Sequence, residues 1–182
     1  RKAVRRIDRN STRLLTLINQ LLELSRLEAG VISVFHESTN LVDAVNEVLE
    51  EYQVLADEKG LELRITHPRR GVVIITDSSK VKEIVRQLVS NAIKFTNHGS
   101  IQIEIHAQDT GGVIRIADSG PGIEDEALRR AFDPFFTTRA DGTGLGLAVT
   151  RRIVEDHGGE IELERRPEGG TAARLVLPAA PR

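Results

Sequence analysis

The chain lacks cysteine, methionine and tryptophan, and aromatic residues make up only 3% of its 182 residues. Without cysteine it can form no disulfide and offers no thiol nucleophile, which suits a reducing cytosol. Because methionine is missing even at position 1, we expect a fragment of a longer protein. No apolar run approaches the ~20 residues of a membrane span, and there is no secretory signal. We therefore expect a cytoplasmic domain, with a membrane anchor in the parent protein left open.

Charge is ordinary in amount but uneven along the chain. The net charge is −2, and 29% of the residues are charged. Residues 1–30 hold seven basic against three acidic side chains, so the remainder is net acidic. A basic segment raises the question of nucleic-acid binding. Sparse aromatics and the lack of a later basic stripe favour the solvated face of an amphipathic helix, so we expect no nucleic-acid partner.

Residues 1–29 are predicted to form one helix. Apolar and small side chains recur there in alternating steps of three and four, as in a heptad seam: Val4, Ile7, Ser11, Leu14, Ile18, Leu21 and Ser25. Further leucines widen the seam, as expected inside a four-helix bundle, and Gly30 ends the helix. We therefore expect two units, a bundle helix at 1–30 and a globular domain at 31–182.

The rest of the chain alternates helical and strand patterns. Helices are predicted from Leu41 to Lys59, after a cap at Thr39 or Asn40, and from a cap at Asp77 or Ser78 through Ile93. Strands are predicted at 61–66 and 72–76, joined by the turn at 67–71. Two hairpins follow, at 100–118 and 160–177. The order predicts an α+β fold, a two-layer α/β sandwich with helices on one face of a mixed, mostly antiparallel sheet.

The candidate site lies between Asp118 and Thr150, where two glycine clusters flank a short acidic helix. Gly120 and Gly122 follow a strand that ends in a carboxylate, so the backbone can turn sharply or approach a flat ligand. Gly142, Gly144 and Gly146 precede an apolar helix, and bare N–H groups at a helix N-terminus bind anions. The sequence has no G-x-x-x-x-G-K-[ST], no G-x-G-x-x-G after a strand and no kinase H-R-D or D-F-G. A different type of nucleotide site is predicted.

Four motifs together resemble the Bergerat ATP-binding fold, which sensor histidine kinases share with DNA gyrase, MutL and a heat-shock ATPase. Residues 118–123 (D-S-G-P-G-I) resemble its first glycine box, and residues 142–147 (G-T-G-L-G-L) the second. Residues 87–96 (Q-L-V-S-N-A-I-K-F-T) resemble the Asn box, and 132–136 (F-D-P-F-F) the Phe box. Residues 25–30 (S-R-L-E-A-G) are similar to the end of the second dimerisation helix of histidine kinases.

The resemblance implies ATP and Mg²⁺ as cofactors and gives each motif a role. Asn91 is the expected metal ligand, and Asn91 and Lys94 are the expected catalytic residues. Asp118 would accept the adenine amine, with Thr171 beside it, while Phe95 and Ile123 would enclose the ring. The expected nucleotide-binding set is Gln87, Asn91, Lys94, Phe95, Asp118, Gly120, Gly122, Ile123, Arg139, Gly142, Thr143, Gly144, Leu145, Gly146, Leu147 and Thr171. Residues 137–141 (T-T-R-A-D) would form a short lid over the nucleotide. For Arg139 in this lid, two interpretations stay open: contact with the terminal phosphate, and simple exposure to solvent.

Gln87 separates two kinds of chemistry. ATPase relatives place a glutamate there as the base for water, and histidine kinases usually have asparagine. Glutamine cannot accept a proton at neutral pH, which argues against a dedicated ATPase.

None of the five histidines is predicted to accept phosphate. His36, His67, His98, His106 and His157 lack the acceptor's sequence surroundings, and none forms a metal-binding pair. We therefore predict the ATP-binding catalytic domain of a sensor histidine kinase, transferring the γ-phosphoryl group to a histidine on a dimerisation helix absent from this sequence, for relay to a response-regulator aspartate. A homodimeric parent is expected. The alternatives are another Bergerat kinase, of the anti-sigma-factor serine kinase type, and a degenerate ATP-binding scaffold.

Overall fold

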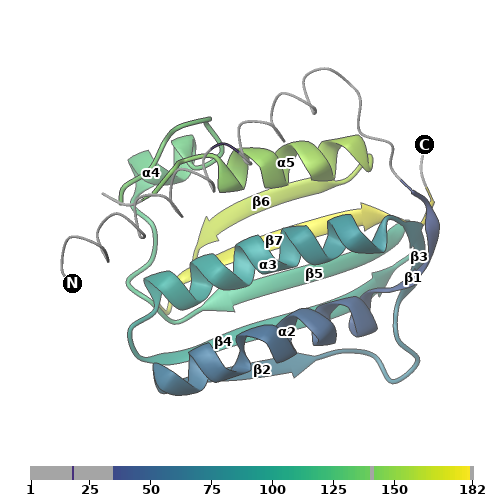
Figure 1. Ribbon diagram of the computed structural model, residues 1–182, viewed down its shortest axis with the longest axis horizontal. Coiled ribbons are helices and arrows are strands. Elements are labelled where there is room, and N and C mark those ends of the chain that lie inside the picture. Colours follow the sequence, from purple (N-terminus) through teal and green to yellow (C-terminus); the bar gives the residue numbers. More distant parts are fainter. Residues whose placement is uncertain (1–17, 19–34, 140–141, 181–182) are drawn as a thin grey trace.

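The computed structural model describes residues 18, 35–139 and 142–180, so the dimerisation helix predicted for residues 1–30 lies, apart from Ile18, outside the described part. The described chain forms two layers, with three long helices lying across one face of a sheet (Figure 1). This arrangement confirms the α+β sandwich expected from the order of helical and strand patterns.

The main sheet has five strands in the order β2-β4-β5-β7-β6. They are β2 (Leu61–Thr66), β4 (Gly99–Gln108), β5 (Gly111–Asp118), β6 (Glu160–Arg165) and β7 (Thr171–Pro178). Strand β2 pairs with β4 in parallel, and all the other neighbours are antiparallel. Both predicted hairpins, β4–β5 and β6–β7, are present, so the sheet is mixed and mostly antiparallel.

Helices α2 (Leu41–Glu58), α3 (Ser78–Phe95) and α5 (Gly146–Asp156) cover one face of this sheet (Figure 1). The Asn40 and Asp77 side chains accept hydrogen bonds from Val42 N and Lys80 N, which fixes the starts of α2 and α3. The predicted apolar face of α3 is buried against the isoleucines of β4 and β5. The short α4 (Asp125–Arg130) lies at the end of the sheet where α5 begins.

Strand β3 (Val73–Thr76) follows β2 across the predicted turn, but the two strands do not pair. Strand β3 pairs with β1 (Glu37–Asn40) in a separate two-stranded sheet. Strand β2 instead pairs with β4 across the whole of α3. The turn at 67–71 therefore moves the chain from the main sheet to a second sheet, and among the described strands only β4 pairs with β2.

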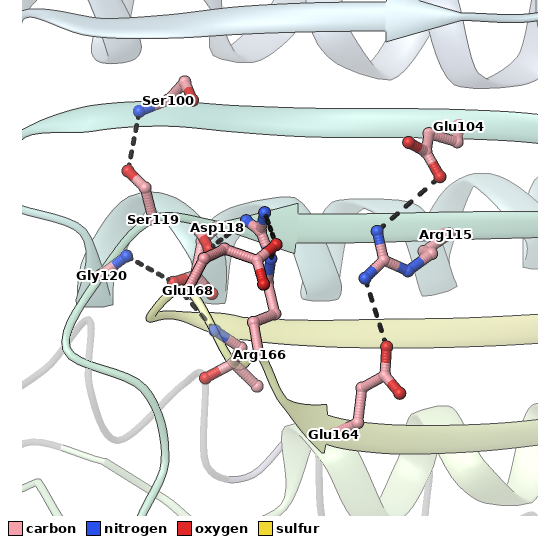
Figure 2. A network of polar contacts seen from close by, with 10 residues as sticks. Ser100, Glu104, Arg115, Asp118, Ser119, Gly120, Glu164, Arg166 and Glu168 are labelled. Carbon is pink, nitrogen blue, oxygen red and sulfur yellow. Dashed lines mark hydrogen bonds and ion pairs between the residues drawn. The ribbon is translucent and has the colours of Figure 1, made fainter.

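The sheet face away from the helices is polar. Arg115 on β5 lies 3.7 Å from the Glu104 carboxylate on β4 and 3.2 Å from that of Glu164 on β6 (Figure 2). Such partly exposed cross-strand pairs contribute modestly to stability and keep this face solvated. Among the residues that the structure describes, no helix has the length and apolar character needed to cross a membrane.

Three elements that carry predicted site residues meet at one end of the molecule. Strand β5 ends at Asp118, α3 ends at Phe95, and α5 begins at Gly146, all at the end of the sheet where α4 lies (Figure 1). Because α3 and β5 end where α5 begins, residues that are far apart in the sequence lie together here.

Candidate functional site

Asp118 is a buried carboxylate at the last position of β5, with only 7% of its surface exposed. Its Oδ1 accepts hydrogen bonds from Gly120 N at 2.8 Å and Thr171 N at 3.4 Å. The backbone carbonyl of the same residue accepts from Arg166 Nη1 at 2.8 Å (Figure 2). The carboxylate is therefore held in one orientation by the backbone of the two neighbouring segments.

The surroundings of the Asp118 carboxyl disfavour its ionised form. Burial raises the pKa of the Asp118 carboxyl, and the Gly120 and Thr171 N–H groups, with the positive charge of Arg166, offset this rise only in part. A buried carboxylate needs partners that favour its charged form. A ligand that donates a hydrogen bond to Asp118 would supply one.

The C-terminal half of α3 presents the amide groups predicted to meet a metal and phosphates. Gln87 Nε2 donates to Asn91 Oδ1 at 3.2 Å, so these two side chains share one helix face, as their spacing of four predicts. Within the described residues no group of three or more His, Cys, Asp and Glu side chains could hold a metal ion. A site with one amide oxygen fits only a cation that keeps most of its waters or takes ligands from a substrate, as Mg²⁺ does.

Two cations and an aromatic ring lie just beyond these amides. The Arg139 guanidinium lies 5.5 Å from the centre of the Phe95 ring. Partial burial lowers the pKa of the Lys94 ammonium, and repulsion by Arg139 lowers it further. Since two positive groups repel each other, their proximity is favoured when an anion lies between them.

The second glycine cluster forms the turn into α5. Gly144 has φ +69°, and a Cβ there would lie 2.3 Å from the backbone carbon of Phe135. Phe135 itself has φ +67°, and its N–H donates to the Gly144 carbonyl at 2.9 Å. The Phe box and the glycine box are thus locked together by backbone contact, which leaves the N-terminus of α5 with its positive dipole end facing the site.

Gly146, the first residue of α5, lies against Gln87. A Cβ on Gly146 would come within 2.4 Å of the Gln87 amide. A cavity of about 280 Å³ opens beside this contact, lined by residues of α2, α3 and α5 that include Gln87, Gly146 and Arg86. Gln87 on α3 and Gly146 at the start of α5 therefore border this cavity, whose lining does not include Asn91 or Lys94.

The remaining predicted residues lie in the loops between these elements. A Cβ on Gly120 would lie 2.9 Å from the Phe95 carbonyl oxygen, and a Cβ on Gly122, which has φ +82°, would lie 3.1 Å from the carbonyl oxygen of Gly170. Ile123 is partly buried directly after Gly122. In the second cluster, a Cβ on Gly142 would collide with the Thr137 hydroxyl, and Thr143 Oγ1 accepts from Leu145 N at 3.4 Å. Leu145 is buried and Leu147 packs against the core, so their side chains anchor the loop. Ala140 and Asp141 of the lid lie outside the described residues.

Arg166 is a site residue that sequence reasoning missed. It lies at the start of the β6–β7 turn, only 12% of its side chain is exposed, and it pairs with Glu168 at 2.5 Å while holding the Asp118 carbonyl (Figure 2). Two adjacent arginines precede the turn in the sequence, and nothing in their order tells which one reaches β5.

The histidines lie where the sequence placed them. His67, His98 and His106 are exposed on turns or strands, and His36 precedes β1. His157 ends α5, is buried, and its Nδ1 lies 2.6 Å from the Ile153 carbonyl. The structure thus puts no histidine among the predicted ligand-binding residues.

Comparison with known proteins gives a family for this site. Residues 76–181 match the family model described as histidine kinase-, DNA gyrase B- and HSP90-like ATPase. The sensor histidine kinase MtrB of Mycobacterium tuberculosis is 34% identical over 169 residues, which is 90% of this chain and 30% of MtrB. The hybrid signal transduction histidine kinase D of Dictyostelium discoideum is 32% identical over 193 residues, all of this chain and 12% of that protein. The chain thus spans less than a third of these relatives.

Solved structures of histidine kinases are also similar to this chain. Full-length ShkA in complex with AMPPNP superposes with a TM-score of 0.85 at 28% identity, covering 100% of this chain and 40% of that one. The nucleotide-free catalytic domain of the histidine kinase ThkA gives 0.75 at 32% identity, over 80% of this chain and 97% of that domain. ThkA in complex with the response regulator TrrA gives 0.83 at 28% identity, over 100% of this chain and 52% of that one.

Proposed function

The chain belongs to the family of histidine kinase-, DNA gyrase B- and HSP90-like ATPases, as the ATP-binding catalytic domain of a histidine kinase, and we propose that its site between β5, α3 and α5 binds ATP with Mg²⁺ for transfer of the γ-phosphoryl group to a histidine. One observation carries this proposal. The buried Asp118, the amide face of α3 and the N-terminus of α5 converge at one end of the sheet.

The base is recognised at the closed end of the site. Asp118 is an acceptor fixed by two backbone donors, so it suits the exocyclic amine of adenine and repels the carbonyl of guanine. Phe95 and Ile123 enclose the ring, and the backbone around Gly120 and Gly122 allows it to approach closely. Thr171, whose N–H already holds Asp118, completes this end.

The phosphates lie toward α5. Backbone N–H groups between Gly142 and Leu147 and the helix dipole favour negative charge there. Lys94 and Arg139 add two cations whose mutual repulsion a bound anion relieves. The chain contributes positioning and charge stabilisation, which is most of what phosphoryl transfer asks of a protein.

Asn91 is the proposed metal ligand, and its Oδ1 is the atom that now accepts from Gln87. Because an amide oxygen has two lone pairs, Asn91 Oδ1 can bind a cation while Gln87 still donates to it. When bound, Mg²⁺ neutralises charge on the phosphates. Gln87 offers no base for water, so the site favours transfer to an incoming nucleophile over hydrolysis.

The acceptor histidine, its dimerisation helix and a response-regulator receiver domain are proposed partners, in a homodimeric parent protein. Such a kinase draws on cellular ATP, so we assign the domain to the cytoplasm. The alternative of an ATP-binding scaffold rests on Gln87, which departs from the usual asparagine. It predicts nucleotide binding without transfer.

Calorimetry of ATP binding with and without Mg²⁺ tests the site. Asn91→Ala is expected to abolish the gain in affinity that Mg²⁺ gives the native chain and to leave the fold intact. Gln53→Ala, an amide truncation on the exposed face of α2, is the matched control and should behave as the native chain does. Asn91→Ala protein that still responds to Mg²⁺ would remove Asn91 from the metal site.

Phosphotransfer is tested by adding a separate helix hairpin that carries the acceptor histidine. Acid-labile label from γ-labelled ATP should appear on that histidine, and not when Asn91 is replaced. Binding of ATP with no label on the added hairpin would favour the scaffold.

A further inference from the structure

The Thr96 hydroxyl is buried without a partner at the edge of the candidate base site. Thr96 is fully buried, and its Oγ1 makes no hydrogen bond within the described chain. A buried hydroxyl left unpaired costs ~1–3 kcal/mol, so native structures rarely keep one without a reason. The two other such atoms, Thr76 Oγ1 and His157 Nε2, lie outside the candidate site, on β3 and at the end of α5.

The backbone of Thr96 is held firmly in place. Its N–H donates to the Ala92 carbonyl at 3.0 Å, which closes the last turn of α3. Its carbonyl accepts from Lys59 Nζ at 3.3 Å, and the same ammonium also caps the Ile93 carbonyl at 2.7 Å. With both backbone groups engaged, only rotation of the side chain about χ1 can move the hydroxyl.

The hydroxyl faces the same small space as the Asp118 carboxylate. A Cβ built on Gly120 would meet Asp118 Oδ1 and the Phe95 carbonyl oxygen at 2.9 Å each, and Thr96 Oγ1 at 3.3 Å. Three oxygens therefore surround Gly120, and only the hydroxyl among them carries a proton. Thr96 helps to lower the pKa of Asp118, although no hydrogen bond joins its Oγ1 to another atom of the described residues.

We propose that Thr96 is a positioning residue for base recognition, whose hydroxyl rotates to donate a hydrogen bond to the Asp118 carboxylate when a 6-aminopurine nucleotide binds. This rests on the proposed function, because it assumes that Asp118 accepts the 6-amino group. The carboxylate can accept from that amine only while it is ionised and correctly turned. Gly120 and Thr171 hold Oδ1 from the backbone, and the Thr96 hydroxyl adds the one side-chain donor. Thr96 thus acts on selectivity through Asp118.

The test compares ATP with purine riboside triphosphate, which lacks the 6-amino group. The native chain should bind ATP more tightly, and the ratio of the two dissociation constants measures recognition of the amine. In the near-isosteric Thr96→Val this ratio should fall on the order of fivefold, the worth of one hydrogen bond. Thr96→Ser, which restores the hydroxyl, should recover the ratio.

Thr76→Val is the matched control, because it removes the other buried, unpartnered threonine hydroxyl away from the site. Both valine variants should melt no lower than the native chain without nucleotide, since each removes an unpaired polar atom. Only Thr96→Val should lose selectivity. If Thr96→Val does not fold, the ratio of the two dissociation constants is measured in Thr96→Ala, which also lacks the hydroxyl.

An unchanged ratio in Thr96→Val, or an equal weakening of both ligands, overturns the proposal, because a packing role moves both affinities together. A native chain that binds neither nucleotide, or both equally, overturns the adenine assignment itself. That failure appears before any variant is made, so it is distinct from failure of the Thr96 role.

Discussion

At the scale of single residues, Asp118 is a carboxylate whose surroundings disfavour its charge. Its folded-state pKa lies above the usual range of an aspartate carboxyl, chiefly through burial. A raised carboxyl pKa contributes stability below the unfolded pKa, and that stability is lost as the pH rises through the folded pKa. The charged form of Asp118 therefore lowers the stability of the nucleotide-free domain.

We predict that Asp118→Asn raises the melting temperature of the nucleotide-free domain at pH 7 and weakens ATP binding. The amide oxygen can still accept from Gly120 and Thr171, so the fold is kept while the buried charge is removed. Each kcal/mol gained corresponds to roughly 2–4 °C in a domain of this size. Loss of the charged acceptor should cost about 1.5–3 kcal/mol of binding.

Thermal melts across pH provide the control. The difference between Asp118→Asn and the native domain should shrink as the pH falls through the range in which carboxyl groups take up protons, because the raised pKa of Asp118 favours its neutral form. A variant less stable than the native domain at every pH would contradict the view that Asp118 is ionised at a cost to stability.

At the scale of elements, the turn into α5 contains two glycines, and a side chain at each position would be disfavoured for a different reason. Gly144 has a positive φ and lies against the backbone of Phe135, whereas Gly146 meets only the Gln87 side chain. Backbone cannot yield, but the end of a flexible side chain can. The phosphate loop is therefore rigid at its start and adaptable where it becomes helix.

We predict that Gly144→Ala loses nearly all ATP affinity and destabilises the domain by ~1 kcal/mol or more. Gly146→Ala, the matched control, should keep the fold and reduce affinity only modestly, because Gln87 can move away. Adding Gln87→Ala to Gly146→Ala should restore part of the affinity, by calorimetry. Equal effects of the two alanines would show that the Phe135 contact does not shape the loop.

The sequence predicted the helices and strands better than it predicted which strands pair with each other. Both hairpins follow from alternation and a short turn, and Asp77 starts α3 because its side chain caps the first turn. The pairing of β2 with β4 did not follow, since periodicity reports which face is buried and not which strand lies alongside. At the candidate site, the glycine spacing and the Asn box led to most of the residues that we propose to bind the nucleotide. Arg166 and Thr96 matter through three-dimensional neighbours, Asp118 and Gly120, which local patterns cannot reveal.

At the scale of the whole molecule, the chain should bind ATP and yet leave its own five histidines unlabelled. Transfer needs the imidazole within roughly 3–3.5 Å of the γ-phosphorus. His157 ends α5, roughly 16 Å from its phosphate-facing start at 1.5 Å per residue, and it is buried. The other four lie on strands and turns outside the predicted binding residues.

Incubation with γ-labelled ATP, followed by mapping of acid-labile label by mass spectrometry, checks this prediction. The separate hairpin with its histidine serves as the positive control. Stoichiometric label on any of His36, His67, His98, His106 or His157 would mean that the acceptor lies within this chain.

The pairing of β5 with β7 has a further consequence for chain length. Thr171 N donates to Asp118 Oδ1, so the segment that holds both glycine boxes and the lid leaves one strand and returns to its direct neighbour. Its ends stay fixed by the sheet whatever its length, and the entropy of closing such a loop rises only by about 0.6 kcal/mol for each doubling. Residues inserted beside Arg139 would therefore hardly alter global stability. The number of residues in the lid can therefore change to suit a different phosphate-accepting partner, while the sheet and the position of Asp118 are kept.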